Sequence, residues 1–313
     1  MPGLRWLKIV CCAIVLVGAL VLVARFLIQR SAPEPVVPGS PQLQVTTSFY
    51  PLYYFASRVA AEHAQVRNIT PAGAEPHDYE PTPADIAQMY ASDLLLIHGG
   101  QFEPWAGGII SELAGHQTRV VAVGERLATQ QLILNDQPVL DPHVWLDPLL
   151  AMQEVEIIRA ALTEIDPANA VSFRQNAALL TADLQTLDSA FRAGLNNCAQ
   201  KDIVTSHAAF GYLAARYQFK QVAIAGLSPD AEPSAGDLAG IADFVRNNNI
   251  RHIFFESLVT PKLSQTIAAE VGAQTLVLNP LEGLTTLEQS AGKNYLSEMN
   301  NNLANLKTAL QCP

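Results

Sequence analysis

Three histidines and one glutamate have the residue types and positions needed to bind a metal ion. His77 lies in the loop segment GAEPHD, His143 lies in DPHVW, and His207 follows an apolar segment. Glu282 lies in a similar loop, NPLEG, after another apolar segment. Imidazole nitrogens and carboxylate oxygens are ligands of tetrahedral Zn²⁺ sites. The set suits a zinc site in which protein fills all four positions, which would favour carriage of the ion over catalysis. The alternative for each histidine taken alone is a surface or capping residue.

Alternating strands and helices must position these residues. The predicted strands are Leu43–Thr47, Val66–Thr70, Leu94–His98, Val120–Val123, Asp202–Thr205, Gln221–Ala225, His252–Glu256 and Gln274–Leu278. Helices are predicted to begin near Pro51, Pro83 and Glu103, and to cover Ser234–Arg246 and Pro261–Val271. This alternation indicates parallel sheets covered by helices. Because ligands bind beyond the carboxyl ends of strands in such sheets, we expect the histidine-bearing loops to meet around a cleft.

A long helical segment separates the two halves. Pro148–Glu164 and Pro167–Asn197 are both predicted to be helical, and apolar residues of the second segment recur every three or four positions. About thirty residues would span roughly 45 Å. The predicted fold class is α/β, with two lobes, each a parallel sheet flanked by helices, joined by one long rigid backbone helix. The predicted boundaries are 42–165 for the N-terminal lobe, 166–197 for the backbone helix and 198–313 for the C-terminal lobe.

The N-terminus carries a basic, apolar segment. Residues 1–30 contain four basic residues and no acidic residue, and residues 9–28 are apolar except for Arg25. This layout is typical of a signal peptide or an N-terminal membrane anchor. The length of the apolar run, about one bilayer span, favours a retained anchor at residues 9–28. A lipid attached to one of two adjacent cysteines in the run is a third alternative, disfavoured because Lys8 and Ile9 stand where a lipoprotein signal needs leucine.

The rest of the chain is acidic and lies outside the cytoplasm on each of these three interpretations. Residues 31–41 form a proline-rich linker. Of the 19 basic residues four precede the linker, which leaves 15 basic against 29 acidic residues, a net charge of −14. An acidic body excludes the basic surface that a nucleic-acid partner needs. In an oxidising compartment, the two body cysteines, Cys198 and Cys312, predict a disulfide bond, with a pair of free thiols as the alternative.

Six segments resemble the metal-binding solute-binding proteins of zinc and manganese ABC importers. These segments are EPHDYEPTPADI, GGQFEPWAGGI, DPHVWLDP, TSHAAFGYLAARY, SPDAEPSAGDLAGI and NPLEGLT. The resemblance covers about residues 42–310, and it implies two α/β lobes joined by one long helix. It places the metal ligands at His77, His143, His207 and Glu282. Histidine at the third ligand position is typical of zinc-type members, because carboxylate-rich sites suit manganese.

The resemblance implies an extracytoplasmic, monomeric, non-enzymatic protein in the periplasm or at the cell surface. It would capture Zn²⁺ and deliver it to the permease of an ABC transporter. We expect its affinity to fall below about pH 6, as histidines of ordinary pKa near 6.5 protonate. A manganese- or iron-binding member of the same family is the closest alternative. A zinc-dependent hydrolase with Glu282 or Glu256 as base is less favoured, because the ligand count is full and no HExxH motif is present. An adhesin or chaperone on the same fold is also less favoured, because the sequence indicates no exposed aromatic patch.

Several neighbouring residues have two interpretations. Asp78, Asp141 and Ser206 are candidates either to orient the imidazoles or to cap helices. His98 stands where the related proteins often have asparagine, and is either an auxiliary donor or a histidine with its hydrogen bonds satisfied in the protein. Residues 122–140 contain no histidine, so the histidine-rich loop of many zinc-type members is absent.

Overall fold

The computed structural model describes residues 42–99, 102–134, 137–231 and 233–313. The predicted signal or anchor at residues 1–30, including the apolar run 9–28, and the linker at 31–41 lie outside the described residues. Over the described part of the chain, no helix combines the length and the apolar character that a membrane crossing requires.

The N-terminal half contains a four-stranded parallel sheet in the order β2-β1-β3-β4. Its strands are β1 (Leu43–Thr47), β2 (Ala64–Asn68), β3 (Leu94–Ile97) and β4 (Arg119–Ala122). All four residues of β3 are buried, as expected for a parallel strand covered on both faces. Strand β2 begins two residues before the predicted Val66, because its parallel register pairs Ala64 with Leu43 at the start of β1.

Helices connect these strands as the alternation predicted. They are α2 (Tyr50–Ala60), α3 (Pro83–Tyr90) and α4 (Ala106–Leu113), with a short 3-10 helix η1 (Ala61–His63) after α2. Helix α3 begins at the predicted position, because Thr82 accepts a hydrogen bond from the backbone N–H of Asp85 and Pro83 occupies the first turn.

The C-terminal half contains a second four-stranded parallel sheet, in the order β10-β9-β7-β8. Its strands are β7 (Asp202–Thr205), β8 (Lys220–Ala223), β9 (His252–Phe255) and β10 (Gln274–Val277). Its helices are α7 (Gly211–Tyr217), α8 (Ala235–Asn247), α9 (Lys262–Val271), α10 (Thr286–Ser290) and α11 (Tyr295–Ala309). The fold class is therefore confirmed as α/β with two parallel sheets flanked by helices.

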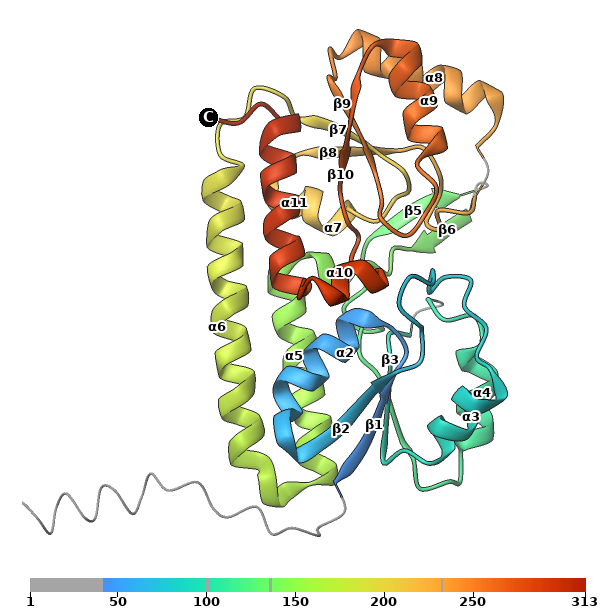
Figure 1. Ribbon diagram of the computed structural model, residues 1–313, viewed down its shortest axis with the longest axis vertical. Coiled ribbons are helices and arrows are strands. Elements are labelled where there is room, and N and C mark those ends of the chain that lie inside the picture. The colour runs from blue at the N-terminus through green and yellow to red at the C-terminus, as the bar shows by residue number, and fades with distance from the viewer. Residues whose placement is uncertain (1–41, 100–101, 135–136, 232) are drawn as a thin grey trace, which may run out of the picture. The chain divides into compact units, whose positions relative to one another are not determined.

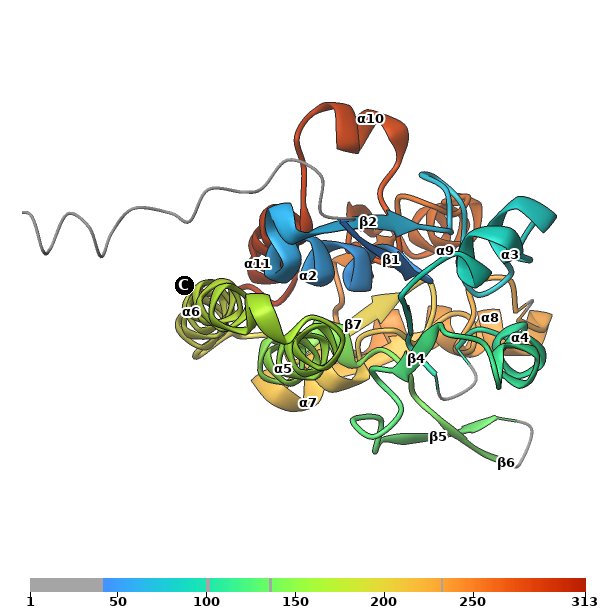
Figure 2. The same cartoon turned by 90° about the horizontal axis from the view of Figure 1, so that it is seen from below.

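Two long helices link the sheets. Helix α5 (Pro148–Ile165) is followed by a 3-10 turn, η3 (Pro167–Asn169), and by α6 (Ala170–Gly194), which begins three residues after the predicted start. Helices α5 and α6 lie side by side in both views, and α11 also packs against α6 (Figures 1 and 2). The apolar stripe of α6 is buried there, and one continuous hydrophobic core includes residues of both sheets and of α5, α6 and α11.

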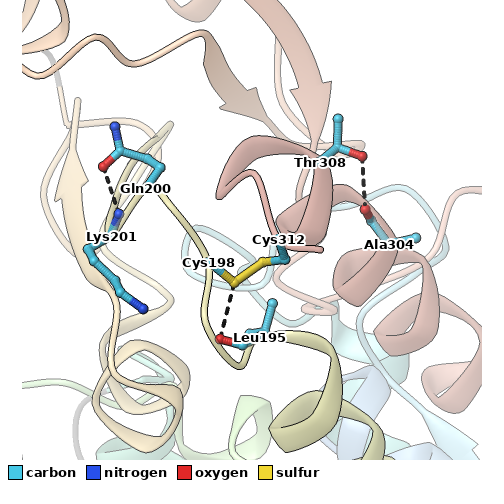
Figure 3. The surroundings of a disulfide bond; sticks show 7 residues. All are labelled: Leu195, Cys198, Gln200, Lys201, Ala304, Thr308 and Cys312. Atoms are coloured by element: carbon cyan, nitrogen blue, oxygen red, sulfur yellow. Dashed lines mark hydrogen bonds between the residues drawn. A yellow bond between two sulfur atoms is a disulfide. The ribbon is translucent and has the colours of Figure 1, made fainter.

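A hairpin of β5 (Gln131–Leu134) and β6 (Gln137–Leu140), which was not predicted from the sequence, lies to one side of the two sheets (Figure 2). The 3-10 helix η2 (Val144–Leu146) follows it. The predicted disulfide is present between Cys198, which follows α6, and Cys312, which follows α11 (Figure 3). It ties the end of the chain to the end of the long helix.

Candidate metal centre

The loops after the carboxyl ends of the strands bring the four predicted ligands together. His77 follows β2, His207 follows β7, and Glu282 follows β10, while His143 lies between β6 and η2. One potential ligand atom from each residue lies within 4.8 Å of all the others. The side chains of His143, His207 and Glu282 are fully buried, and that of His77 is 10% exposed.

The distances within the cluster match the spacing of ligands around one small ion. Glu282 Oε1 lies 3.2 Å from Nε2 of both His143 and His207, and 3.4 Å from Nε2 of His77. The Nε2 atoms of His143 and His207 are 3.4 Å apart. Two ligands that each lie about 2.0 Å from a tetrahedral ion are about 3.3 Å apart. Four of the six separations among the ligand atoms thus match a tetrahedral site, and all of them lie within 4.8 Å.

Buried carboxylates orient two of the three imidazoles. Asp141 Oδ1 lies 2.8 Å from Nδ1 of His143 and also accepts the backbone N–H of His143 at 2.9 Å. Glu256 Oε1 lies 2.7 Å from Nδ1 of His207. Each contact leaves Nε2 directed into the cluster, the arrangement usual for metal-bound histidine. Of the two alternatives for Asp141, the structure shows the one in which it orients an imidazole.

The backbone around Glu282 is held in an uncommon conformation. Leu281 has a φ of 60°, in the left-handed region that non-glycine residues rarely adopt. Its N–H donates to Asn279 Oδ1 at 2.8 Å, and Asn302 both accepts from and donates to the backbone of Asn279. Because all four residues are buried, this network fixes the direction of the Glu282 side chain.

His77 is held differently. Its loop contains no helix or strand between β2 and α3, and its ring packs edge-on against Phe102 with centroids 4.7 Å apart. Its backbone N–H donates to Glu75 Oε1 at 3.2 Å. Burial, followed by the charge of Glu282, raises the pKa of Glu75 to about 9. His77 and Phe102 line a cavity of about 900 Å³ that is also lined by Ile241 and Phe244 of α8.

The electrostatics of the cluster favour a carboxylate facing protonated imidazoles when no ion is bound. Burial raises the pKa of Glu282, but the charge of His207 and hydrogen bonds from the histidines outweigh it, and the pKa lies well below its usual range. Burial lowers the pKa of His207, but the carboxylates of Glu256 and Glu282 raise it well above 6.5. The same balance of burial against Asp141 and Glu282 raises the pKa of His143.

His77 behaves oppositely, since burial is its largest influence and lowers its pKa. An incoming cation must therefore displace protons from His143 and His207. Protons therefore compete with the cation for His143 and His207 at a higher pH than the ordinary imidazole pKa of about 6.5 would indicate.

Other residues singled out in the sequence lie elsewhere. Ser206 donates to the carbonyl of Phe254 at 3.3 Å, and the Asp78 carboxyl interacts with Asp230, which raises the pKa of Asp78 to about 6. Neither Ser206 nor Asp78 therefore orients an imidazole, which was one of the two alternatives for each. Glu256 contacts a ligand rather than joining the set. The sequence does place Glu256 at the carboxyl end of a predicted strand, and this position was the signal that it lies near the metal centre.

The two halves are also joined directly behind the cluster. Trp145 in η2 donates its Nε1–H to the carbonyl of Pro280 at 2.7 Å, and Arg216 of α7 pairs with Asp147 at 2.7 Å. Tyr212 donates to the carbonyl of Asp141 at 3.0 Å. These contacts hold the His143 loop against the C-terminal half.

Two parallel sheets with a buried histidine and carboxylate cluster at their facing edges define a solute-binding protein of the metal-binding class. The chain belongs to the ZnuA family, described as zinc-uptake complex component A, periplasmic, whose model matches residues 45–309. The family resemblance stated from the sequence is thereby confirmed.

Curated relatives and a solved structure show the same similarity. The high-affinity zinc uptake system protein ZnuA of Bacillus subtilis is 37% identical over 94% of this chain and 97% of its own length. The zinc-binding lipoprotein AdcA of Streptococcus pneumoniae is 40% identical over 85% of this chain, but the match spans 55% of AdcA. The crystal structure of the Zn(II)-bound ZnuA-like domain of AdcA is also 40% identical. It superposes with a TM-score of 0.76 and covers 86% of this chain and 99% of that domain.

Proposed function

We propose that this chain is an extracytoplasmic solute-binding protein that captures Zn²⁺ and delivers it to the permease of an ABC importer. The ion would be bound by His77, His143, His207 and Glu282. The observation that carries the proposal is the convergence of these four ligand atoms within 4.8 Å at a buried position.

The donor set supports zinc over manganese. Three imidazole nitrogens and one carboxylate oxygen suit Zn²⁺, whereas Mn²⁺ prefers sites richer in oxygen. The relatives named for zinc uptake and zinc binding agree with this choice. Asp141 and Glu256 supply the carboxylate partners that raise imidazole basicity in metal sites.

The same geometry supports binding rather than hydrolysis. A catalytic zinc site keeps a position open for water, and four protein ligands leave none. Glu256, one of the two candidate bases, is directed at Nδ1 of His207. We therefore infer that the chain is not an enzyme.

The organisation of the whole chain follows from this function. Residues 9–28 would act as a signal or a retained membrane anchor, and residues 31–41 as the linker to a monomeric body. That body would comprise lobes 42–165 and 198–313 on a backbone helix at 166–197. The shared core behind the cluster supports release of the ion through loop and small lobe movements instead of a wide hinge.

Calorimetry with metal analysis tests the proposal. We expect one Zn²⁺ per chain, and a loss of at least 100-fold in affinity in H207A, because a buried ligand is removed. H116A, which changes an exposed histidine, is the matched control and should bind as the unaltered protein does. Unchanged stoichiometry and affinity in both H77A and H207A would refute the site. Delivery predicts that cells lacking the protein accumulate less zinc when external zinc is scarce.

A further inference from the structure

A second pair of titratable side chains is buried beside the metal centre. His98, at the end of β3, is 1% exposed, and Glu154, on α5, is fully buried. His98 Nδ1 lies 3.7 Å from Glu154 Oε1. Neither ring nitrogen and neither carboxylate oxygen has a hydrogen-bond partner among the described residues. Four unpartnered polar atoms in a core are costly, so the pair calls for an explanation.

The burial of the pair favours neutral forms of both groups. Burial raises the pKa of Glu154 well above its ordinary value, and burial followed by the charge of His143 lowers the pKa of His98 to about 3. A neutral carboxyl has one O–H donor, and a neutral imidazole has one acceptor nitrogen. A water between the two atoms would need a separation of roughly 5 Å, whereas a direct O–H···N bond needs an approach of about 1 Å from the present distance.

We propose that Glu154 is a positioning residue whose carboxyl O–H donates directly to Nδ1 of His98. His98 is thereby held as the Nε2–H tautomer, in one orientation behind the metal centre. We assign the backbone carbonyl of Pro142 as the acceptor for the remaining N–H. The bond between Glu154 and His98 gives a partner to the carboxyl O–H and to Nδ1, which would otherwise both be unpartnered in the core.

The ring of His98 has little room for another orientation. A Cβ placed on Gly124 would overlap the His98 ring, so the ring fills the space that glycine leaves. On its other sides it meets Phe102 and Trp145 edge-on, with centroids 5.3 and 5.1 Å away. The pair therefore locks a ring that is already confined by its neighbours.

Those two aromatic residues lie directly against the proposed ligands. Phe102 packs on His77 with centroids 4.7 Å apart, and Trp145 packs on His143 at 5.2 Å. His98 and Glu154 thus support Phe102 and Trp145 on the side away from the ligands. Pro142, the proposed acceptor for His98, directly precedes the ligand His143. The effect on the ion rests on the proposed function, whereas the tautomer of His98 does not.

Nitrogen-15 histidine spectra and zinc titrations test the two parts separately. In the unaltered protein, long-range ¹H–¹⁵N spectra, assigned with H98N, should show His98 as a neutral Nε2–H tautomer at pH 7. E154Q keeps a donor and should preserve this signature, with zinc affinity within twofold. E154M removes the donor at similar volume, and should give a mixture of tautomers and an affinity about three- to tenfold weaker, a smaller loss than for a ligand's direct partner.

V155A is the matched control, because it removes buried volume from the neighbouring position of α5. It should lower the melting temperature without changing the tautomer or the zinc affinity. An imidazolium or an Nδ1–H tautomer in the unaltered protein would overturn the proposal, even if E154M does not fold. Equal zinc affinity in E154M and E154Q would overturn the positioning role. Absence of zinc binding in the unaltered protein would instead refute the proposed function and leave the tautomer test standing.

Discussion

Glu256 Oε1 lies 2.7 Å from Nδ1 of His207, and both side chains are buried. Glu256 directly follows β9 and His207 follows β7, and these strands are hydrogen-bonded neighbours in one parallel sheet. The sheet therefore places a carboxylate beside the imidazole that it orients. The contact directs Nε2 of His207 toward Glu282, 3.2 Å away.

The substitution E256Q should weaken zinc binding by about tenfold, the lower end of the range for partners of metal-bound histidines. Glutamine keeps an acceptor for the Nδ1–H but removes the charge that raises the basicity of His207. Competition with a chelator of known affinity measures the change. E270Q alters an exposed glutamate on α9 and is the control. Equal affinity in E256Q and the unaltered protein would mean that Glu256 does not act on the site.

The substitution G211A should also weaken zinc binding, from a position outside the ligand set. A Cβ on Gly211 would lie 2.6 Å from Asp141 Oδ2. The other oxygen of Asp141 contacts Nδ1 of His143, so displacing the carboxylate should change the orientation of the His143 ring. We expect a loss of about tenfold, as for a direct partner of the ligand.

Gly108 provides the control, because a Cβ there meets nothing within 4 Å. G108A in α4 should raise stability by roughly 0.5–1 kcal/mol, as alanine replaces glycine in a helix, and leave zinc affinity unchanged. If G211A bound zinc as tightly as G108A does, Asp141 would not control the orientation of His143.

Zinc affinity should increase with pH through and above 6.5. His143 and His207 have raised pKa values in the metal-free protein, so zinc binding releases their protons. Their raised pKa values stabilise the metal-free fold fully below the unfolded pKa of about 6.5, and this stabilisation is lost as pH rises through the folded values. The lowered pKa of Glu282 adds stability that is fully present above its ordinary pKa of about 4.5. This stability is lost as pH falls through the pKa of Glu282 in the folded protein.

The difference in melting temperature between zinc-loaded and chelator-treated protein should therefore widen from pH 6 to pH 8. Calorimetry in buffers of different ionisation enthalpy should detect proton release on binding at pH 7. A difference that is flat across this range would show that neither histidine is protonated before the ion binds.

The disulfide should contribute to stability without affecting the metal centre. Cys198 and Cys312 are 114 residues apart in sequence, so the bridge closes a long loop in the unfolded chain. We expect C198S/C312S to lower the free energy of unfolding by about 2–4 kcal/mol. Zinc affinity should stay within twofold of the unaltered protein. Denaturant unfolding with and without reductant measures the effect, and equal stability under both conditions would contradict it.

The regular elements of the fold were predictable where the sequence pattern is local. Residues Leu43–Thr47 and Asp202–Thr205 form strands with the predicted bounds, because short apolar runs bounded by polar segments suit buried parallel strands. The helical period of the second long helix also matched its buried face. Helix α11 was missed because its segment, YLSEMNNNLANLKTA, is rich in asparagine, and its packing against α6 outweighs that low helix propensity.

The ligand set was accessible from residue chemistry and family resemblance, but its supporting contacts were not. Glu256 and His207 are 49 residues apart, and a sequence gives no distance between such positions. The left-handed backbone of Leu281 follows from the buried network around Asn279, which no local propensity indicates. His98 was expected to be either an auxiliary donor or a satisfied histidine. The structure instead places it against Glu154, with both of its nitrogens unpartnered among the described residues.

X-ray absorption at the zinc edge, on protein loaded with one equivalent of Zn²⁺, is the direct test of the four proposed ligands. We expect four nitrogen or oxygen neighbours at roughly 2.0–2.1 Å, with the multiple scattering of three imidazoles. In H207A the imidazole signal should fall to two rings. A first shell with sulfur, with six ligands, or with fewer than three imidazoles in the unaltered protein would contradict the assignment of His77, His143, His207 and Glu282 as the zinc ligands.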